Sequence, residues 1–255
     1  NMHLTCTNIE AEKVTSALEE AKAAGIRNIV ALRGDAPAGQ EKWEATEGGF
    51  KCAEDLVKYM RKTTGDYFCI SVAGYPEGHP DKILPVKGGV EALSESEKTR
   101  YSVQTAEDGT KTVSVCSDAD FDVELTYLKA KVDAGADFII TQMFFDTATY
   151  AAFVSACSAK GINVPIVPGI MCINAYGGFK RMTGFCKTRV PPTLAEQLEE
   201  ASKGGDAAVK QFGIDFGVAM CKRLLEAGAP GLHFITLNLE PSATALSLRA
   251  EKVQP

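Results

Sequence analysis

The dipeptide Ala-Gly occurs at three predicted helix ends in this sequence, and this repeat constrains the fold more than any other feature. Ala24-Gly25, Ala134-Gly135 and Ala227-Gly228 each close a stretch of helical spacing and precede a short apolar run. Glycine just beyond a helix is a common end signal because it takes left-handed backbone angles without strain. Each dipeptide therefore marks a helix followed by a buried strand, and the repetition predicts a chain of βα units.

The strand pattern favours a parallel sheet. Ile29 to Leu32 is a continuous aliphatic run, as expected of a strand that is covered on both faces. Strands are predicted over residues 1–6, 28–32, 68–73, 138–141, 165–170 and 233–237. Helices are predicted from a cap at Thr7 or Asn8 up to Gly25, and over residues 53–60, 121–134, 147–160, 179–185 and 206–227.

Such an alternation of strands and helices builds either a doubly wound sheet or a barrel. No Gly-x-Gly-x-x-Gly turn follows a predicted strand, which weakens the dinucleotide-binding alternative. The predicted class is therefore an α/β fold of the (β/α)8 TIM-barrel type, with six of the eight units present in this chain. We expect a single domain over residues 1–255, because barrels of this kind often use a similar length.

Residues from about 81 to 119 lose the periodicity of the rest of the chain and are rich in Lys, Glu, Ser, Thr and Gly. This stretch is longer than the usual limit of about 12–15 residues for a loop. We interpret it as a polar insertion that is solvated and mobile, and that the core does not need.

The charge balance argues against nucleic acid and membrane partners. The formal net charge is -6 and the pI is about 5.3, so a small molecule is the favoured partner. The eight cysteines include no Cys-x-x-Cys pair, which indicates reduced packing residues of an intracellular, cytoplasmic protein. No leader or membrane-spanning run is recognisable, and the oligomeric state stays open, a homo-oligomer included.

Polar residues gather where predicted strands end. Arg33, Gly34 and Asp35 follow the second strand, and the third strand runs into the glycine- and proline-rich segment 73–80. Alpha/beta folds place ligands at the carboxyl ends of their strands, and a cation, a glycine and a carboxylate suit a charged, planar or phosphorylated ligand. A surface turn with an ion pair explains the same tripeptide equally well.

Five segments, in order along the chain, resemble the methylenetetrahydrofolate reductase family in its eukaryotic form. They are residues 3–6, 28–35, 72–80, 131–142 and 233–238. The resemblance covers nearly the whole chain outside the insertion and implies an eight-stranded β/α barrel that carries FAD. In the family two βα units come before the segment that matches residues 3–6, and they include a glutamate used as general acid. We therefore expect this chain to lack those units and to show at best residual folate turnover by itself.

The resemblance also implies roles for single residues at the flavin. Arg33 and Lys131 can neutralise a diphosphate and Tyr75 can stack on a planar ring, whereas their ordinary roles are surface ion pairing and packing. The full set implied for the flavin and its phosphates is His3, Thr5, Arg33, Gly34, Asp35, Ala53, Ala73, Tyr75, His79, Glu124 and Lys131.

Asp35 and Gln142 are the catalytic candidates that the resemblance implies. The family carboxylate that matches Asp35 lies near the pterin and the reactive end of the flavin, where negative charge disfavours anionic reduced flavin. Gln142 offers two donors and two acceptors to a pterin edge. Folate contacts are implied for Asp35, Gln142, Tyr176 and Ile235, although Ile235 and Leu239 stand where many members have a tyrosine and an arginine.

The function implied is reduction of 5,10-methylenetetrahydrofolate to 5-methyltetrahydrofolate in one-carbon and methionine metabolism, with FAD as cofactor and NADH or NADPH as hydride source. Two alternatives remain, a non-catalytic flavin or folate binder and a cofactor-free barrel lyase. The lyase needs a desolvated lysine at a strand end, and none is recognisable in the sequence. The three histidines lack the spacing of metal ligands, so no metal site is expected.

Overall fold

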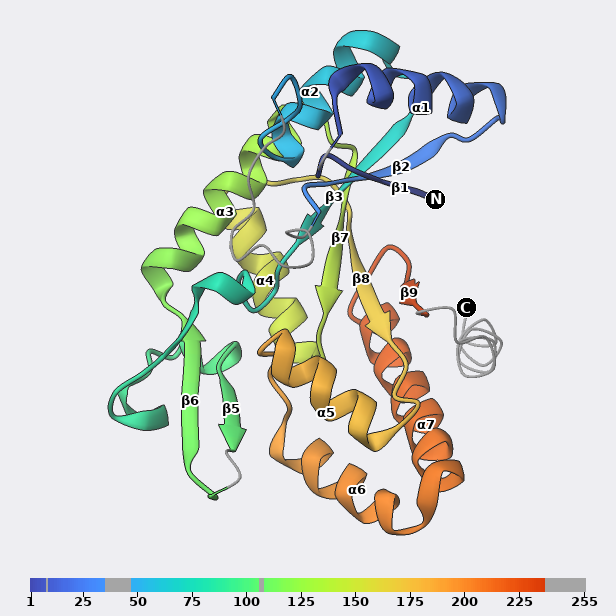
Figure 1. Ribbon diagram of the computed structural model, residues 1–255. Coiled ribbons are helices and arrows are strands. Elements are labelled where there is room, and N and C mark those ends of the chain that lie inside the picture. The colour runs from blue at the N-terminus through green and yellow to red at the C-terminus, as the bar shows by residue number, and fades with distance from the viewer. Residues whose placement is uncertain (8, 35–46, 106–107, 237–255) are drawn as a thin grey trace. The chain divides into compact units, whose positions relative to one another are not determined.

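The computed structural model describes residues 1–7, 9–34, 47–105 and 108–236, and Figure 1 shows its helices and strands. The strands are β1 (Met2–Thr5), β2 (Asn28–Leu32), β3 (Cys69–Gly74), β4 (Ile83–Pro85), β5 (Ser102–Thr105), β6 (Lys111–Cys116), β7 (Phe138–Met143), β8 (Ile166–Met171) and β9 (His233–Ile235). The helices are α1 (Ala11–Ala23), α2 (Ala53–Thr64), α3 (Asp118–Asp133), α4 (Thr147–Ala159), α5 (Tyr176–Phe185), α6 (Pro192–Lys203) and α7 (Gly205–Glu226).

The chain divides into two compact units, each of which is described by itself. Unit 1 consists of Asn1–Gly74, Thr126–Ile140 and Lys160–Pro165, and unit 2 consists of Tyr75–Leu125, Thr141–Ala159 and Ile166–Pro255. The prediction of a single domain is not tested by this division and stays a prediction.

In unit 1 the sheet order is β1-β2-β3, followed by the first half of β7. The pairs β1·β2 and β2·β3 are parallel, as the aliphatic runs predict. Ile29, Val30 and Ala31 of β2 are all buried, so both faces of this strand are covered. Helix α2 covers part of the sheet with the buried side chains of Leu56 and Met60.

In unit 2 the second half of β7 is followed by β8 and β9, and the pair β8·β9 is parallel. Thr141 of β7 accepts a hydrogen bond through Oγ1 from the backbone N–H of Gly169 in β8, at 2.9 Å. A side chain at Gly169 would collide with the Thr141 carbonyl, so glycine lets these backbones approach. The predicted α/β class with parallel strands is confirmed.

The insertion corrects one expectation, because it is not a plain solvated excursion. Strands β4, β6 and β5 form a separate antiparallel sheet in that order, and the segment also contains three short 3-10 turns. Figure 1 shows β5 beside β6. Arg100 is only 2% exposed and donates to the Cys116 carbonyl at 2.9 Å and to Asp118 at 2.5 Å. The insertion therefore has buried polar anchors of its own, which offset part of the entropy of ordering it.

Two helix predictions also need correction. The N-cap of α1 is Glu10 and makes no side-chain capping bond, whereas Thr7 donates its hydroxyl to the Arg33 carbonyl instead. Helix α6 was not predicted, although Leu194 and Leu198 supply its buried face at a spacing of four residues. The glycine ends are confirmed, since Gly25, Gly135 and Gly228 have φ values of 74°, 116° and 88°.

All eight cysteines are free, and five of them are buried. Burial raises the pKa of the Cys6 and Cys116 thiols to about 11, and that of Cys157 and Cys221 to about 12. These residues behave as packing side chains, as predicted. Among the described helices, none has both the length and the apolarity needed to cross a membrane.

Candidate functional site

In unit 1 the structure brings together the ends of β1 and β2. Thr7 Oγ1 donates to the Arg33 carbonyl at 2.7 Å, and the backbone N–H of Cys6 donates to the Leu32 carbonyl at 3.1 Å. Gly34 has a φ of 86°, and a Cβ there would collide with Thr7 Oγ1. Only glycine fits this close approach, so the predicted need for a glycine beside Arg33 has a structural reason.

A second group in unit 1 lies between β3 and α3. The Lys131 side chain is buried, and its Nζ donates to the Ala73 carbonyl at 2.7 Å. The same ammonium lies 5.0 Å from the centre of the Tyr127 ring. A buried positive charge attracts anions more strongly than an exposed one, because water screens it less. The position of Lys131 therefore favours a ligand with negative charge.

Helix α2 begins at Ala53 in the same unit, and its N-cap Cys52 makes no capping bond through its side chain. Tyr127 of α3 lies near this helix start, where Cys52 and Glu54 influence its hydroxyl. Burial is the main reason that the pKa of Tyr127 is raised. The first turn of a helix favours anions because its N–H groups are not used inside the helix.

In unit 2 the segment after β3 folds into a turn that carries two rings. The Tyr75 and His79 rings lie 4.9 Å apart in an edge-on arrangement, and Gly78 N–H donates to the Tyr75 carbonyl at 3.0 Å. Gly78 has a φ of 92°, and a Cβ there would lie 2.6 Å from Cys116 Sγ. The turn is therefore pressed against β6, and its shape depends on glycine.

Glu77 is buried at the centre of this turn and is not among the site residues that the sequence predicts. Its Oε2 accepts the backbone N–H of Arg189 at 2.7 Å, while Oε1 has no hydrogen-bond partner among the described residues. Burial raises the pKa of Glu77 to about 8, against the lowering effect of the Arg189 hydrogen bond and charge. A proline and glycine turn is usually exposed, so sequence alone gives no signal of this burial.

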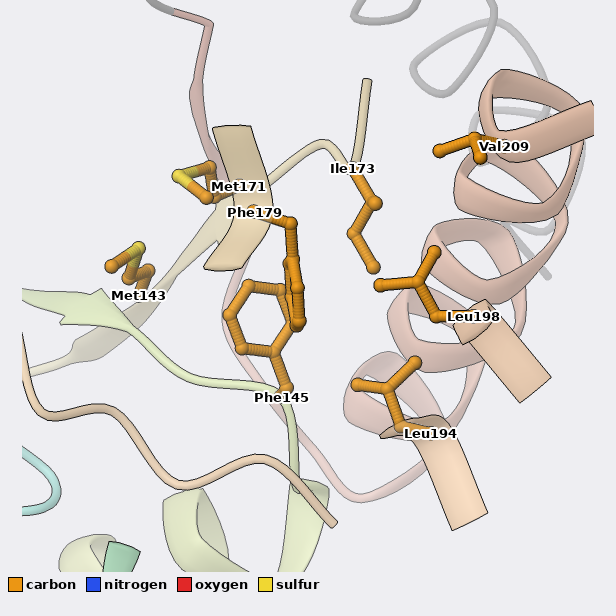
Figure 2. Close-up of a cluster of buried hydrophobic side chains, with 8 residues drawn as sticks. All are labelled: Met143, Phe145, Met171, Ile173, Phe179, Leu194, Leu198 and Val209. Atoms are coloured by element: carbon orange, nitrogen blue, oxygen red, sulfur yellow. The ribbon is translucent and has the colours of Figure 1, made fainter. Parts of the chain in front are cut away.

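An apolar cluster in unit 2 holds the remaining substrate candidates. Tyr176 begins α5 and Ile235 ends β9, and both pack against the cluster. The Phe145 and Phe179 rings lie 4.9 Å apart within it. Figure 2 shows its buried members: Met143, Phe145, Met171, Ile173, Phe179, Leu194, Leu198 and Val209.

Gln142 lies on β7 between two buried residues, Thr141 and Met143, and its own side chain is exposed. An exposed amide at the end of an otherwise buried strand is free to bind a ligand edge. Glu124 is half-buried on α3, and His3 is exposed on β1. Gln142 and Glu124 form no side-chain hydrogen bond or ion pair with another candidate among the described residues of unit 2. Asp35 lies outside the described residues.

The structure corrects the statement that no desolvated lysine lies at a strand end. Lys131 is buried, and its ammonium lies at the end of β3, where it bonds to Ala73. The sequence did not indicate this, because Lys131 belongs to helix α3 and not to a strand. Among the parts of the chain that the structure describes, no three His, Cys, Asp or Glu side chains are placed to hold a metal ion.

The amino-acid sequence is similar to that of known proteins of one family. The family profile described as methylenetetrahydrofolate reductase matches residues 1–250. A Zea mays protein named methylenetetrahydrofolate reductase (NADH) 1 is 48% identical over 246 residues, which are 96% of this chain and 37% of that protein. An Arabidopsis thaliana protein of the same name is 49% identical over 245 residues, with the same two shares.

A Caenorhabditis elegans protein named probable methylenetetrahydrofolate reductase (NADPH) is 36% identical over 242 residues, 94% of this chain and 30% of that protein. This chain thus spans about a third of the length of these relatives. Because the family profile covers all but its last few residues, the chain belongs to the methylenetetrahydrofolate reductase family.

Proposed function

We propose that this protein reduces 5,10-methylenetetrahydrofolate to 5-methyltetrahydrofolate, with FAD as cofactor and NADH or NADPH as hydride source. Membership of the family and the names of its relatives support the folate reaction and the reduced nicotinamide. The structural observation that carries the flavin part is the buried Lys131 ammonium at the end of β3. A location in the cytoplasm and self-association stay predictions.

The residues present in unit 1 fit the phosphate part of FAD. Lys131 supplies a buried positive charge, Arg33 supplies a second cation, and α2 begins at Ala53 without a capping side chain. These are the three features that bind diphosphates in proteins: cations, a helix start and a glycine that admits close approach. We propose that Arg33, Gly34, Ala53, Ala73 and Lys131 hold the diphosphate, with His3 and Thr5 as further flavin contacts.

The turn in unit 2 fits a planar ring. Tyr75 and His79 present two aromatic rings in one short segment, and the turn between them has a glycine with positive φ at Gly78. We propose that these rings contact the flavin, together with Glu124 of α3. When bound, FAD supplies reversible two-electron chemistry, and the protein side chains orient and tune it.

The folate contacts are proposed for unit 2. Gln142 can pair its exposed amide with a pterin edge, since it has two donors and two acceptors. Tyr176 and Ile235 lie at the border of the apolar cluster, where they can contact the aromatic part of a folate. From the resemblance we also propose that Asp35 places a negative charge near the reactive end of the flavin, which disfavours the anionic reduced flavin and makes it a better hydride donor.

The fold proposed for the natural protein is the eight-stranded barrel of the family, to which this chain contributes six βα units. Within each unit the parallel strands follow the order of the chain, β1-β2-β3 in unit 1 and β8-β9 in unit 2, and chain order is the order found in such barrels. The carboxyl ends of β1, β2, β3 and β7 then carry the proposed contacts. This is the end at which barrel enzymes place their sites.

A visible spectrum tests the proposed function. The folded protein mixed with FAD and passed through a desalting column should stay yellow, and anaerobic NADH or NADPH should bleach it. Addition of 5,10-methylenetetrahydrofolate should then restore the colour and yield 5-methyltetrahydrofolate, which chromatography identifies. With this chain by itself we expect that step to be slow, because the family's general acid lies in units that it lacks. A protein that retains no flavin contradicts the proposal.

The same sample distinguishes the proposed reductase from the cofactor-free lyase. The lyase is worth testing because Lys131 is buried. A Schiff base between Lys131 and a carbonyl substrate would be trapped by borohydride as a stable mass increase. We expect no such adduct with simple keto acids, because the Lys131 ammonium is bonded to the Ala73 carbonyl.

A further inference from the structure

Two segments of unit 2 that are far apart in the sequence are tied together by hydrogen bonds. Lys187 Nζ donates to the Pro80 carbonyl at 3.0 Å and to the Ile83 carbonyl at 2.8 Å. Arg189 N–H donates to Glu77 Oε2 at 2.7 Å. The connection between α5 and α6 therefore holds the segment that carries Tyr75 and His79 at three points.

The connection is itself held in a fixed shape. Lys187 is the one non-glycine residue with a positive φ, 52°, in the described part of the chain. The next residue, Thr188, is buried and donates its N–H to the Thr183 carbonyl at 2.9 Å. Backbone strain of this kind persists only where surrounding contacts impose it, and such positions are often functional.

The Arg189 side chain adds a further support. Its Nε donates to Asp146 Oδ2 at 3.4 Å, and its guanidinium lies 4.5 Å from the centre of the Tyr101 ring. Asp146 in turn accepts the N–H of Ala148 at the start of α4. These side-chain contacts hold Arg189 in place, so its backbone N–H is kept in position to donate to Glu77.

Burial of Glu77 is costly. One oxygen is left without a hydrogen-bond partner among the described residues, and a buried polar atom in that state lowers stability. An apolar side chain of similar size would avoid this cost but would leave the Arg189 N–H without its acceptor. The group lies two residues from Tyr75 and two from His79, so a role in shaping the turn accounts for its presence.

We propose that Glu77 is a positioning residue for flavin binding: by accepting the Arg189 hydrogen bond it holds the turn in the shape that presents Tyr75 and His79. This inference rests on the proposed function, since that function assigns both rings to the flavin. The charged groups that face Glu77 are Arg189 and Asp146, the first favouring its ionised form and the second opposing it.

The test compares Glu77→Leu with Glu77→Gln. Leucine fills a similar volume but accepts no hydrogen bond, whereas glutamine keeps an acceptor for Arg189. At pH 7 we expect Glu77→Leu to weaken FAD binding by about tenfold, measured by quenching of flavin fluorescence, and glutamine to stay close to wild type. The matched control is Glu200→Leu, because Glu200 is exposed on α6 and pairs only with its neighbour Lys203 in the structure.

A pH profile separates positioning from general packing. Ionisation strengthens the hydrogen bond from Arg189 but leaves a charge in a buried site, and the burial cost is the larger of the two effects. The turn should therefore loosen, and FAD binding by wild type should weaken between pH 7 and pH 9. Glutamine does not ionise, and its profile should lack that step. Identical profiles for wild type and Glu77→Gln would overturn the proposal.

Amide hydrogen exchange tests, without flavin, whether the hydrogen bonds from Lys187 and Arg189 hold the turn in place. These bonds are called the tie. Amides of residues 76–83 should exchange faster in Glu77→Leu than in wild type and the control. If Glu77→Leu does not fold, Lys187→Met replaces it, since it removes the two bonds to Pro80 and Ile83 while keeping the aliphatic stem. Unchanged exchange in the folded variant refutes the tie. A wild type that binds no FAD refutes the proposed function, while the exchange result still decides whether the tie exists.

Discussion

Lys131 and Ala73 are joined by a 2.7 Å hydrogen bond from the lysine Nζ to the carbonyl oxygen, which links α3 to the end of β3. The Lys131 side chain is buried, so water screens its positive charge less than that of an exposed lysine. A phosphate group near this ammonium would therefore be attracted strongly. The first two predictions test this use of charge.

Lys131→Met should weaken FAD binding by about 10- to 100-fold, because it removes the buried cation and keeps the length of the side chain. Lys129→Met is the control on the same helix, where Lys129 forms an exposed pair with Asp133. Equilibrium titration of both variants with FAD makes the comparison. Equal affinity of the two variants would mean that the phosphates bind elsewhere.

Arg33→Ala should lose flavin during gel filtration, and more so at high salt, because screening weakens the remaining charge attraction. Arg27→Ala is the matched control, since Arg27 lies just before β2 and stacks on Tyr67 at 3.9 Å. The measurement is the molar ratio of flavin to protein in the eluted peak, obtained from their absorbances. A salt-independent molar ratio near one for Arg33→Ala would count against a diphosphate site at this residue.

Gly34→Ala should lower stability more than Gly25→Ala. Both positions have positive φ values, 86° and 74°, so each alanine costs about 1 kcal/mol in backbone strain. Only at Gly34 does the new Cβ collide with Thr7, which adds about 1–3 kcal/mol. Chemical denaturation measures both, and Thr7→Ala in the Gly34→Ala background should recover most of the added loss. No recovery would show that the collision is not the cause.

Glu77→Gln should change how stability depends on pH. The folded-state pKa of Glu77, about 8, lies above its ordinary value, so the folded state binds more protons than the unfolded state between the two. Wild-type stability contributed by this group is therefore full at low pH and is lost as the pH rises through about 8. The variant lacks this loss. The Tm of the variant minus the Tm of wild type should therefore increase from pH 5 to pH 9. Each kcal/mol of relative unfolding free energy corresponds to about 2–4 °C. A constant difference in Tm would show that Glu77 titrates normally.

The repeated βα pattern could be predicted because it depends on local signals. Aliphatic runs mark the strands, and glycines at positions such as Gly25 and Gly135 mark the helix ends. The insertion was harder, because β5 and β6 are short and one face of their sheet is polar. The alternation Thr112, Val113, Ser114, Val115 was nevertheless a usable strand signal.

The candidate site was predictable only where a motif names its residues. Arg33, Gly34, Tyr75, His79 and Lys131 belong to such motifs. The tie between Glu77 and Arg189 spans 112 residues and depends on burial, which no local pattern encodes. Helix α6 was missed for a related reason, because its two buried leucines matter only once α7 packs beside them.

The burial of five cysteines gives the protein an internal reporter of core opening. Thiolates react with alkylating reagents and thiols do not, so residues such as Cys157 and Cys221, whose pKa is raised to about 12, stay unlabelled while the core is closed. Cys52, Cys69 and Cys186 are only partly buried and should be labelled first. The labelling rate of the other five then measures how often each part of the native protein opens to solvent.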